Sequence, residues 1–105
     1  MIKAFHNQTI VTINKTPTNE TRFCLIDCDV LREVIADLSN GAFKVYMCLA
    51  QHSAGYEMIF TRRIAEEVYG IKQKQYRTAI QELIDKGYLV PGEDRANSYT
   101  FYDHP

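Results

Sequence analysis

The chain has 105 residues, 46% of them hydrophobic, and its 12 Lys and Arg residues nearly balance its 13 Asp and Glu residues. This length is typical of one domain with one core, and the apolar fraction together with a net charge of -1 argues against intrinsic disorder. No apolar run approaches the roughly 20 residues of a membrane span, and residues 1–10 lack the basic start and the apolar stretch of an export signal. Three cysteines, an odd number, argue against a disulfide framework. We therefore expect a cytoplasmic globular protein with no membrane partner.

The first 37 residues predict a β-hairpin followed by a short helix. Residues 9–13 alternate Thr with Ile and Val, and residues 22–26 form a second apolar run, as expected for two strands. The sequence between them is rich in turn formers and contains Pro17. Asp29 then offers the N-cap of a helix that extends to Ile35. We expect residues 1–37 to pack on residues 38–105 as part of the same domain.

Residues 39–60 predict an amphipathic helix and a short strand. The inward stripe of the helix recurs at i, i+3, i+4 and i+7 and consists of Phe43, Tyr46, Met47 and Ala50. Cys48 lies within this apolar helix and is expected in the core. Gly55 ends the segment, and the apolar residues 56–60 then predict a strand.

Residues 61–102 predict two further helices and a two-stranded hairpin. Thr61 is a good N-cap, and the inner face behind it consists of Ile64, Ala65 and Val68. Gly70 lies where a tight turn between helices requires a positive φ. The last helix ends at Lys86 and Gly87, and its inner stripe consists of Tyr76, Ala79, Ile80, Leu83 and Ile84. Residues 88–90 and 98–102 predict strands, with residues 91–97 as the loop between them.

This order of elements over residues 43–102 resembles the winged helix-turn-helix family. Residues 64–71 resemble the first helix and turn of the motif, and residues 76–89 resemble a recognition helix that continues into the first wing strand. The most specific part is residues 82–89, which combine a helix-ending Lys-Gly with an aromatic residue that starts the hairpin. The resemblance implies an α+β fold in which residues 38–105 form a three-helix core with a two-stranded wing. The N-terminal hairpin and short helix are additions to that fold.

A second resemblance concerns residues 38–50, which look like the opening helix of winged-helix domains in plasmid and phage replication initiators of the RepA and DnaD types. It implies a DNA-binding protein of a bacterial mobile element or phage, acting in replication initiation or transcription regulation.

The residues predicted to contact DNA follow from this layout, because the major groove, about 12 Å wide, admits one helix that is braced from behind. Residues 72–81 hold three cationic side chains and no acid, and Arg, Lys and Gln are suited to phosphates and base edges. Lys72 stands where the family usually has a Ser or Thr N-cap. The predicted DNA-binding residues are Arg62, Arg63, Lys72, Gln73, Lys74, Arg77, Thr78, Gln81, Arg95 and Asn97. Of these, Arg62 and Arg63 are expected on the DNA backbone, and Arg95 and Asn97 in the wing.

The alternative is a winged helix that docks on a replication, transcription or defence protein. A sequence pI near 6.3 and the acidic residues Glu93 and Asp94 beside Arg95 favour this alternative. On the DNA-binding reading, duplex is favoured over single-stranded DNA, although seven tyrosines offer stacking surfaces. A homodimer through the N-terminal hairpin would suit a palindromic site.

Catalysis and bound cofactors find no support in the sequence. It contains neither a Gly-rich phosphate loop nor a nucleophile elbow. Cys24, Cys28 and His52 have loose spacing and lack a second ligand pair, so we expect no metal site. We expect a protein that is not an enzyme and needs no cofactor.

Overall fold

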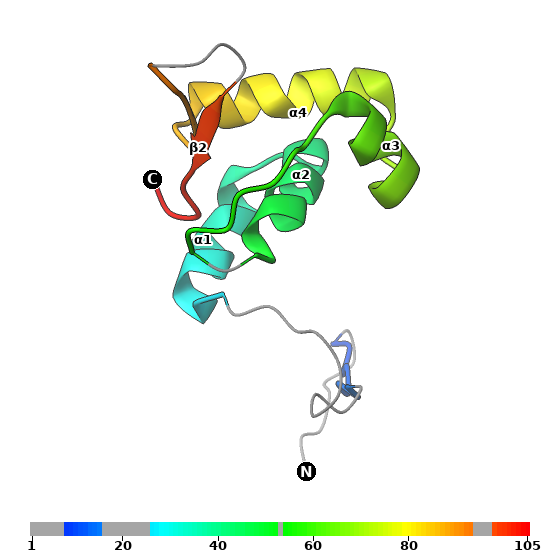
Figure 1. Ribbon diagram of the computed structural model, residues 1–105. Coiled ribbons are helices and arrows are strands. Elements are labelled where there is room, and N and C mark those ends of the chain that lie inside the picture. The colour runs from blue at the N-terminus through cyan, green and yellow to red at the C-terminus, as the bar shows by residue number, and fades with distance from the viewer. Residues whose placement is uncertain (1–7, 16–25, 53, 94–97) are drawn as a thin grey trace.

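The computed structural model describes residues 8–15, 26–52, 54–93 and 98–105, and in this part of the chain it contains four helices and one two-stranded antiparallel sheet (Figure 1). This α+β architecture agrees with the winged helix-turn-helix expected from the sequence. No helix within these ranges has both the length and the apolar character needed to cross a membrane.

The first two helices begin at side chains that cap their free N–H groups. α1 (Cys28–Asp37) starts after Asp27, whose carboxylate accepts hydrogen bonds from the N–H groups of Asp29 (2.9 Å) and Val30 (3.1 Å). The predicted cap at Asp29 is therefore wrong by two residues, because Asp27 reaches the same turn first. α2 (Asn40–Ala50) starts after Ser39, whose hydroxyl accepts a hydrogen bond from the N–H of Ala42.

The turn between the next two helices agrees with the sequence prediction. α3 (Arg62–Tyr69) is capped by Thr61, whose Oγ1 accepts from the N–H of Ile64 at 3.1 Å. Gly70 ends it with φ = 70°, a left-handed conformation that favours glycine. α4 (Gln73–Asp85) follows after only three residues. Its N-cap is Lys72, which makes no side-chain capping bond.

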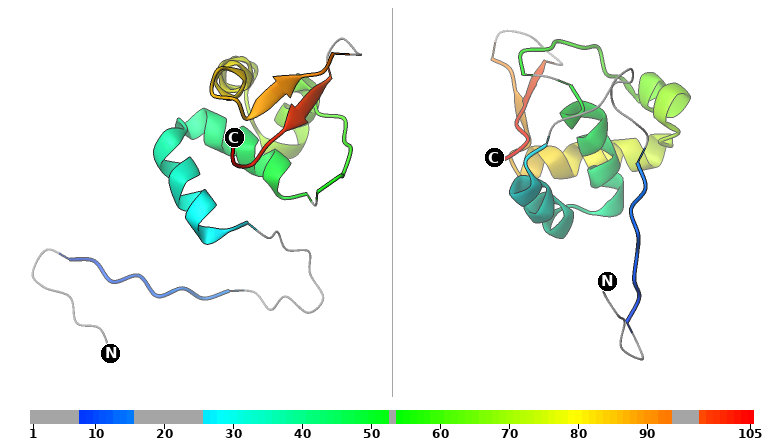
Figure 2. Two further views of the ribbon diagram at one scale, coloured as in Figure 1. Left: turned by 90° about the vertical axis from the view of Figure 1, so that its left-hand side faces the viewer. Right: turned by 90° about the horizontal axis from the view of Figure 1, so that it is seen from below.

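The wing is short and antiparallel. β1 (Leu89–Pro91) pairs with β2 (Tyr99–Phe101), with Leu89 opposite Phe101. Pro91, expected in the loop, is the last residue of β1. The left view of Figure 2 looks nearly along α4 and shows the hairpin and α2 on two different sides of that helix.

The core lies where α2 crosses α4. Tyr46, fully buried, is its centre: its ring meets Tyr88 at 5.8 Å and Phe101 at 5.4 Å in edge-on geometry, and its hydroxyl donates to the Asp103 carbonyl at 3.0 Å. Cys48 is buried here, as expected. The buried hydrophobic residues are Val34, Leu38, Ala42, Val45, Tyr46, Cys48, Ala65, Ile71, Ala79, Leu83, Tyr88 and Leu89. All four helices and β1 contribute to this one core.

Two predicted strands are not formed. Residues 56–60 form neither helix nor strand, and the same holds for residues 8–15, where the first arm of the expected hairpin lies. A run of β-branched or apolar residues favours the extended conformation, but a strand forms only where a second strand supplies its hydrogen bonds. Residues 8–15 lie apart from the helices in Figure 1 and in the left view of Figure 2, and their side chains are exposed. Most of the second predicted arm, residues 22–25, lies outside the described residues.

The predicted inner face of α3 is only partly correct. Ala65 is fully buried and Ile64 is half-buried, but the side chain of Val68 is 65% exposed. The physical reason is position, because α3 lies at the edge of the domain and its last turn projects there (Figure 1).

Candidate nucleic-acid interface

One face of α4 is held firmly against the rest of the domain. Ala79 and Leu83 are buried, and the ring of Tyr76 packs 5.8 Å from that of Phe60. Ile80 and Ile84 pack on the same core, so the whole predicted inner stripe of this helix is confirmed. The opposite face is thereby presented to solvent on a rigid support, which is the arrangement that a helix needs to enter a DNA groove.

A hydrogen-bonded contact fixes the start of α2 against the last turn of α4. The carboxylate of Glu82 accepts from the Ser39 N–H at 2.9 Å and from the Ser39 hydroxyl at 2.6 Å. Burial raises the pKa of Glu82, but the Ser39 hydrogen bonds and the nearby Lys86 ammonium outweigh it and leave that pKa lowered. The charged carboxylate therefore holds the two helices at a fixed spacing. This contact was not predicted from the sequence. Its signal there was the acidic residue Glu82, which lies at the edge of the polar face of α4.

The predicted DNA-binding residues of this region are all on the solvent side. Lys72, Gln73, Lys74, Arg77, Thr78 and Gln81 are exposed. The ion pairs of the described residues include none of Lys72, Lys74 and Arg77, so the cationic charge of this face is not neutralised by a neighbouring carboxylate there. The electrostatic field over the N-terminal half of α4 is therefore available to an external anion.

Two side chains of this face are already engaged within α4. The Thr78 hydroxyl donates to the backbone carbonyl of Lys74 at 3.1 Å, and the Gln81 amide donates to the Asp85 carboxylate at 2.9 Å. The acid at Asp85 ends the cationic stretch. The exposed face of α4 thus changes along the helix, from basic at its start to neutral and then acidic at its end.

The arginines of α3 differ from each other. Arg63 forms a hydrogen-bonded ion pair with Glu67 at 3.0 Å, whereas Arg62 is exposed and has no carboxylate partner in the described part of the chain. Arg62 is therefore the better placed of the two for a phosphate. The predicted wing contacts, Arg95 and Asn97, lie outside the described residues.

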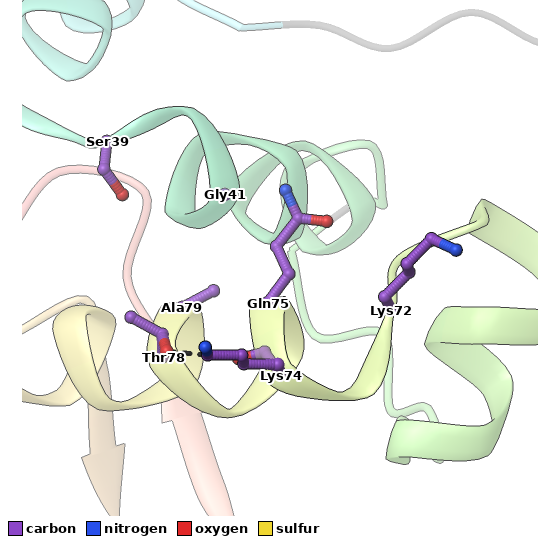
Figure 3. Close-up of a pocket in the computed structure, with 7 residues that line it drawn as sticks. All are labelled: Ser39, Gly41, Lys72, Lys74, Gln75, Thr78 and Ala79. Carbon is purple, nitrogen blue, oxygen red and sulfur yellow. Dashed lines mark hydrogen bonds between the residues drawn. The ribbon is translucent and has the colours of Figure 1, made fainter.

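A hollow of about 500 Å³ opens between the start of α2 and the start of α4. Figure 3 shows Gln75 pointing from α4 toward α2 beside Gly41, while Lys74 lies along α4 toward Thr78. The seven residues that line it are Ser39, Gly41, Lys72, Lys74, Gln75, Thr78 and Ala79. Three of them were predicted DNA contacts. Ser39 and Gly41 were not, because their proximity to the lysines arises from the packing of α2 on α4. Gln75 and Ala79 belong to α4 itself but were not predicted as DNA contacts either.

Cys24, Cys28 and His52 are the residues whose side chains could bind a metal but whose spacing is loose. Cys28 is exposed at the start of α1, His52 stacks on Tyr56 with ring centres 4.5 Å apart, and Cys24 lies outside the described residues. No group of three His, Cys, Asp or Glu side chains comes together in the ranges that the structure describes.

The three helices α2, α3 and α4, with a glycine turn between the last two and a hairpin behind them, define a helix-turn-helix domain. The profile of the helix-turn-helix domain family matches residues 36–89, which is 54 of the 105 residues, and the chain belongs to this family. The match covers α2, α3 and α4 completely and ends at the first residue of β1. Neither the search of curated proteins nor that of solved structures found a match.

Proposed function

We propose that this protein binds duplex DNA by placing α4 in the major groove. The observation that carries the proposal is the exposed start of α4, where Lys72, Lys74 and Arg77 have no acidic partner among the described residues while the opposite face is locked in the core. Phosphate contacts by these cations supply most of the affinity. Outward side chains such as Arg77 and Gln73 contact base edges, where Arg pairs with guanine and Gln with adenine.

Fluorescence anisotropy with a labelled duplex tests the proposal. Binding should weaken steeply as salt rises, with a log–log slope of about 0.9 per phosphate contacted. The double substitution Lys74→Glu with Arg77→Glu should remove it. The matched control is Arg32→Glu on α1, an exposed arginine in a loose 3.7 Å surface pair, which should bind like the unmodified chain. Equal loss in both variants, or no salt dependence, would contradict the proposal.

We further propose that the DNA bound is a replication origin or a promoter of a bacterial mobile element or phage. The support is the likeness of residues 38–50 to the opening helix of plasmid and phage initiator domains. Selection of bound fragments from the genome that encodes the chain tests this proposal. Enrichment of one origin-proximal or promoter sequence is the expected result, and uniform recovery of unrelated fragments would contradict it.

A homodimer is part of the proposal. Ile10, Val11 and Ile13 are 50%, 71% and 71% exposed, and an apolar extended segment of this kind gains stability by pairing with a second copy. Two copies related by a two-fold axis would place two α4 helices on a palindromic site. Light scattering should give twice the chain mass of 12.1 kDa, and a single-chain mass at all concentrations would contradict the dimer.

Protein docking is the second candidate, and the exposed apolar side chains beyond α4 favour it. Val68 is 65% exposed and Ile59 78%, and a second hollow of about 490 Å³ is lined largely by apolar residues of α2 and the α3–α4 turn, including Phe43, Met47 and Ile71. Such patches are typical of protein interaction sites. The same salt titration separates the two functions, because a docking module has no reason to bind duplex DNA with a steep salt slope.

A further inference from the structure

The second hollow, between α2 and the α3–α4 turn, is apolar at its centre and polar at its edge. Its lining residues are Phe43, Lys44, Met47, Cys48, Gln51, Tyr69 and Ile71. The four apolar side chains are buried or half-buried, whereas Lys44, Gln51 and Tyr69 are exposed. An apolar centre with a polar rim is the arrangement of a surface that binds a segment of another protein chain.

Hydrogen bonds hold one edge of the second hollow in place. The side-chain amide of Gln51 donates to the Cys48 carbonyl at 3.0 Å and to the Tyr69 hydroxyl at 3.1 Å. The Tyr69 ring in turn packs on that of Phe60, with ring centres 6.1 Å apart. The end of α2 is thus tied to the end of α3. The hollow beside them is therefore preformed, and an incoming segment does not have to open it.

Residues 8–15 carry a surface that matches this hollow. They run extended in the left view of Figure 2, and alternate side chains of an extended segment share one face, so Val11 and Ile13 face one way and Ile10 the other. Side chains two positions apart on such a face are about 7 Å apart. Phe43 and Met47, one turn apart on α2, have a similar spacing of about 6 Å. Residues 8–14 carry no charge, so their insertion buries none.

A second copy of the chain is the occupant that these observations favour. Residues 8–15 lie apart from the helices of their own copy (Figure 1), and among the described residues the core and the side chains packed on it come from Val30 onward. Each copy therefore offers one apolar segment and one apolar hollow. A two-fold axis lets both pairs form together. Two such contacts bring the buried area closer to the roughly 1,200 Å² of a stable interface than one short segment does.

We propose that residues 8–15 of one copy insert Val11 and Ile13 into the second hollow of the other copy, which does the same in return. This inference rests on the proposed homodimer and deepens it by naming the two surfaces that meet. The lining of the second hollow includes none of the predicted DNA-binding residues. Assembly and DNA binding would therefore use separate surfaces of the same domain.

Cross-linking between two differently substituted chains tests the proposal. Both chains carry Cys24→Ser and Cys28→Ser, which leaves Cys48, whose buried thiol has a pKa of about 11 and reacts slowly. One chain adds Asn14→Cys, next to Ile13, and the other adds Lys44→Cys at the exposed edge of the second hollow. A short bismaleimide is added to the equimolar mixture of full chains, and peptide mass spectrometry identifies the linked pairs.

The matched control replaces Lys44→Cys with Arg77→Cys, on the exposed face of α4. The Asn14–Lys44 pair should form more than about tenfold faster than the Asn14–Arg77 pair, because the effective concentration within a dimer far exceeds that of free chains. Adding Val11→Ser and Ile13→Ser to the first chain should remove this excess. Ile10→Ser, on the opposite face of the segment, should preserve it.

Each other outcome identifies a different arrangement. Preferential linkage of two Asn14→Cys chains would show that the segments pair with each other, and a dimer mass without any excess would place the contact elsewhere. Both results overturn this inference while the homodimer stands. A single chain that carries both cysteines and links them at single-chain mass would show that the segment fills its own hollow. No excess together with a single-chain mass in light scattering would overturn the homodimer as well, and would leave the hollow to a different protein.

Discussion

Asp37, at the end of α1, joins three parts of the fold through one carboxylate. It accepts from the Tyr88 hydroxyl at 2.8 Å, and the Lys86 ammonium at the end of α4 bonds both to its side chain and to its backbone carbonyl. The hydrogen bonds from Tyr88 and then Lys86 lower the pKa of Asp37 below its ordinary 3.8. The charged form therefore stabilises the fold above that pH. This stabilisation is lost as the pH falls through the lowered pKa.

Substitution Asp37→Asn should accordingly lower the midpoint of thermal unfolding at neutral pH, and the difference from the unmodified chain should shrink below pH 3.8. Circular dichroism melts across the acid range measure it. Asp29→Asn is the control, because the Asp29 carboxylate is 86% exposed in its pair with Arg32 and should matter little at any pH. A deficit in Asp37→Asn that is the same at every pH would contradict the assignment.

Cys48 offers a second prediction at the scale of single residues. Burial raises the pKa of its thiol to about 11, from an ordinary 9.0, whereas Cys28 is exposed. Because the thiolate is the reactive form, this higher pKa alone slows alkylation of Cys48 about a hundredfold. Iodoacetamide should therefore label Cys28 in the native protein and Cys48 only after denaturation. Peptide mass mapping over time distinguishes the two sites, and comparable native rates would show that α2 opens far more readily than its buried face indicates.

At the scale of elements, α4 alone begins without a side-chain cap among the four helices of the described residues. Lys72 makes no capping hydrogen bond, whereas the caps of α1, α2 and α3 all do. Serine at this position would satisfy a free N–H and typically adds about 1 kcal/mol. A lysine here gives up that stability and places a cation beside the hollow instead. We interpret the missing cap as a local loss of stability that is offset by the role of Lys72 in the proposed DNA binding.

Lys72→Ser should therefore raise the free energy of unfolding by about 1 kcal/mol. It should also lower the salt slope of DNA binding by up to about 0.9, the value for one phosphate contact. Chemical denaturation and anisotropy measure the two effects on the same preparation. Thr61→Ala calibrates the first, since it removes the working cap of α3 and should cost about 1 kcal/mol. A stabilised variant that binds DNA as well as the unmodified chain would remove Lys72 from the interface.

For the whole molecule, the sequence predicted helices well where local signals suffice. Thr61 and Gly70 mark the ends of α3, and the stripe from Tyr76 to Ile84 defines the inner face of α4, because capping and helical periodicity act within a few residues. Strand formation depends on a partner elsewhere in the chain. Residues 56–60 have the apolar run of a strand and form none in the structure.

The site divides in the same way. The exposed polar residues of α4, among them Lys74 and Arg77, can be predicted from the helical periodicity of that segment alone. The contact of Ser39 with Glu82 spans 43 positions, and the approach of Gly41 to Gln75 depends on how α2 crosses α4. Neither has a signature within one element, so sequence reasoning found the charged face and missed the hollow beside it.

Residues 8–15, here called the N-terminal arm, supply the last prediction. We expect the apolar side chains of this arm to contribute to dimer formation and not to the stability of the fold. Ile10, Val11 and Ile13 are at least half exposed, so replacing all three with Ser should leave the free energy of unfolding within about 0.5 kcal/mol of its original value. Leu83→Ala, in contrast, truncates a fully buried side chain and should cost about 2 to 5 kcal/mol. If the arm joins two copies as proposed, the Ser variant should fall to the single-chain mass in light scattering while its thermal unfolding at low concentration is unchanged. A Ser variant that unfolds as easily as Leu83→Ala would show instead that the arm packs on its own domain.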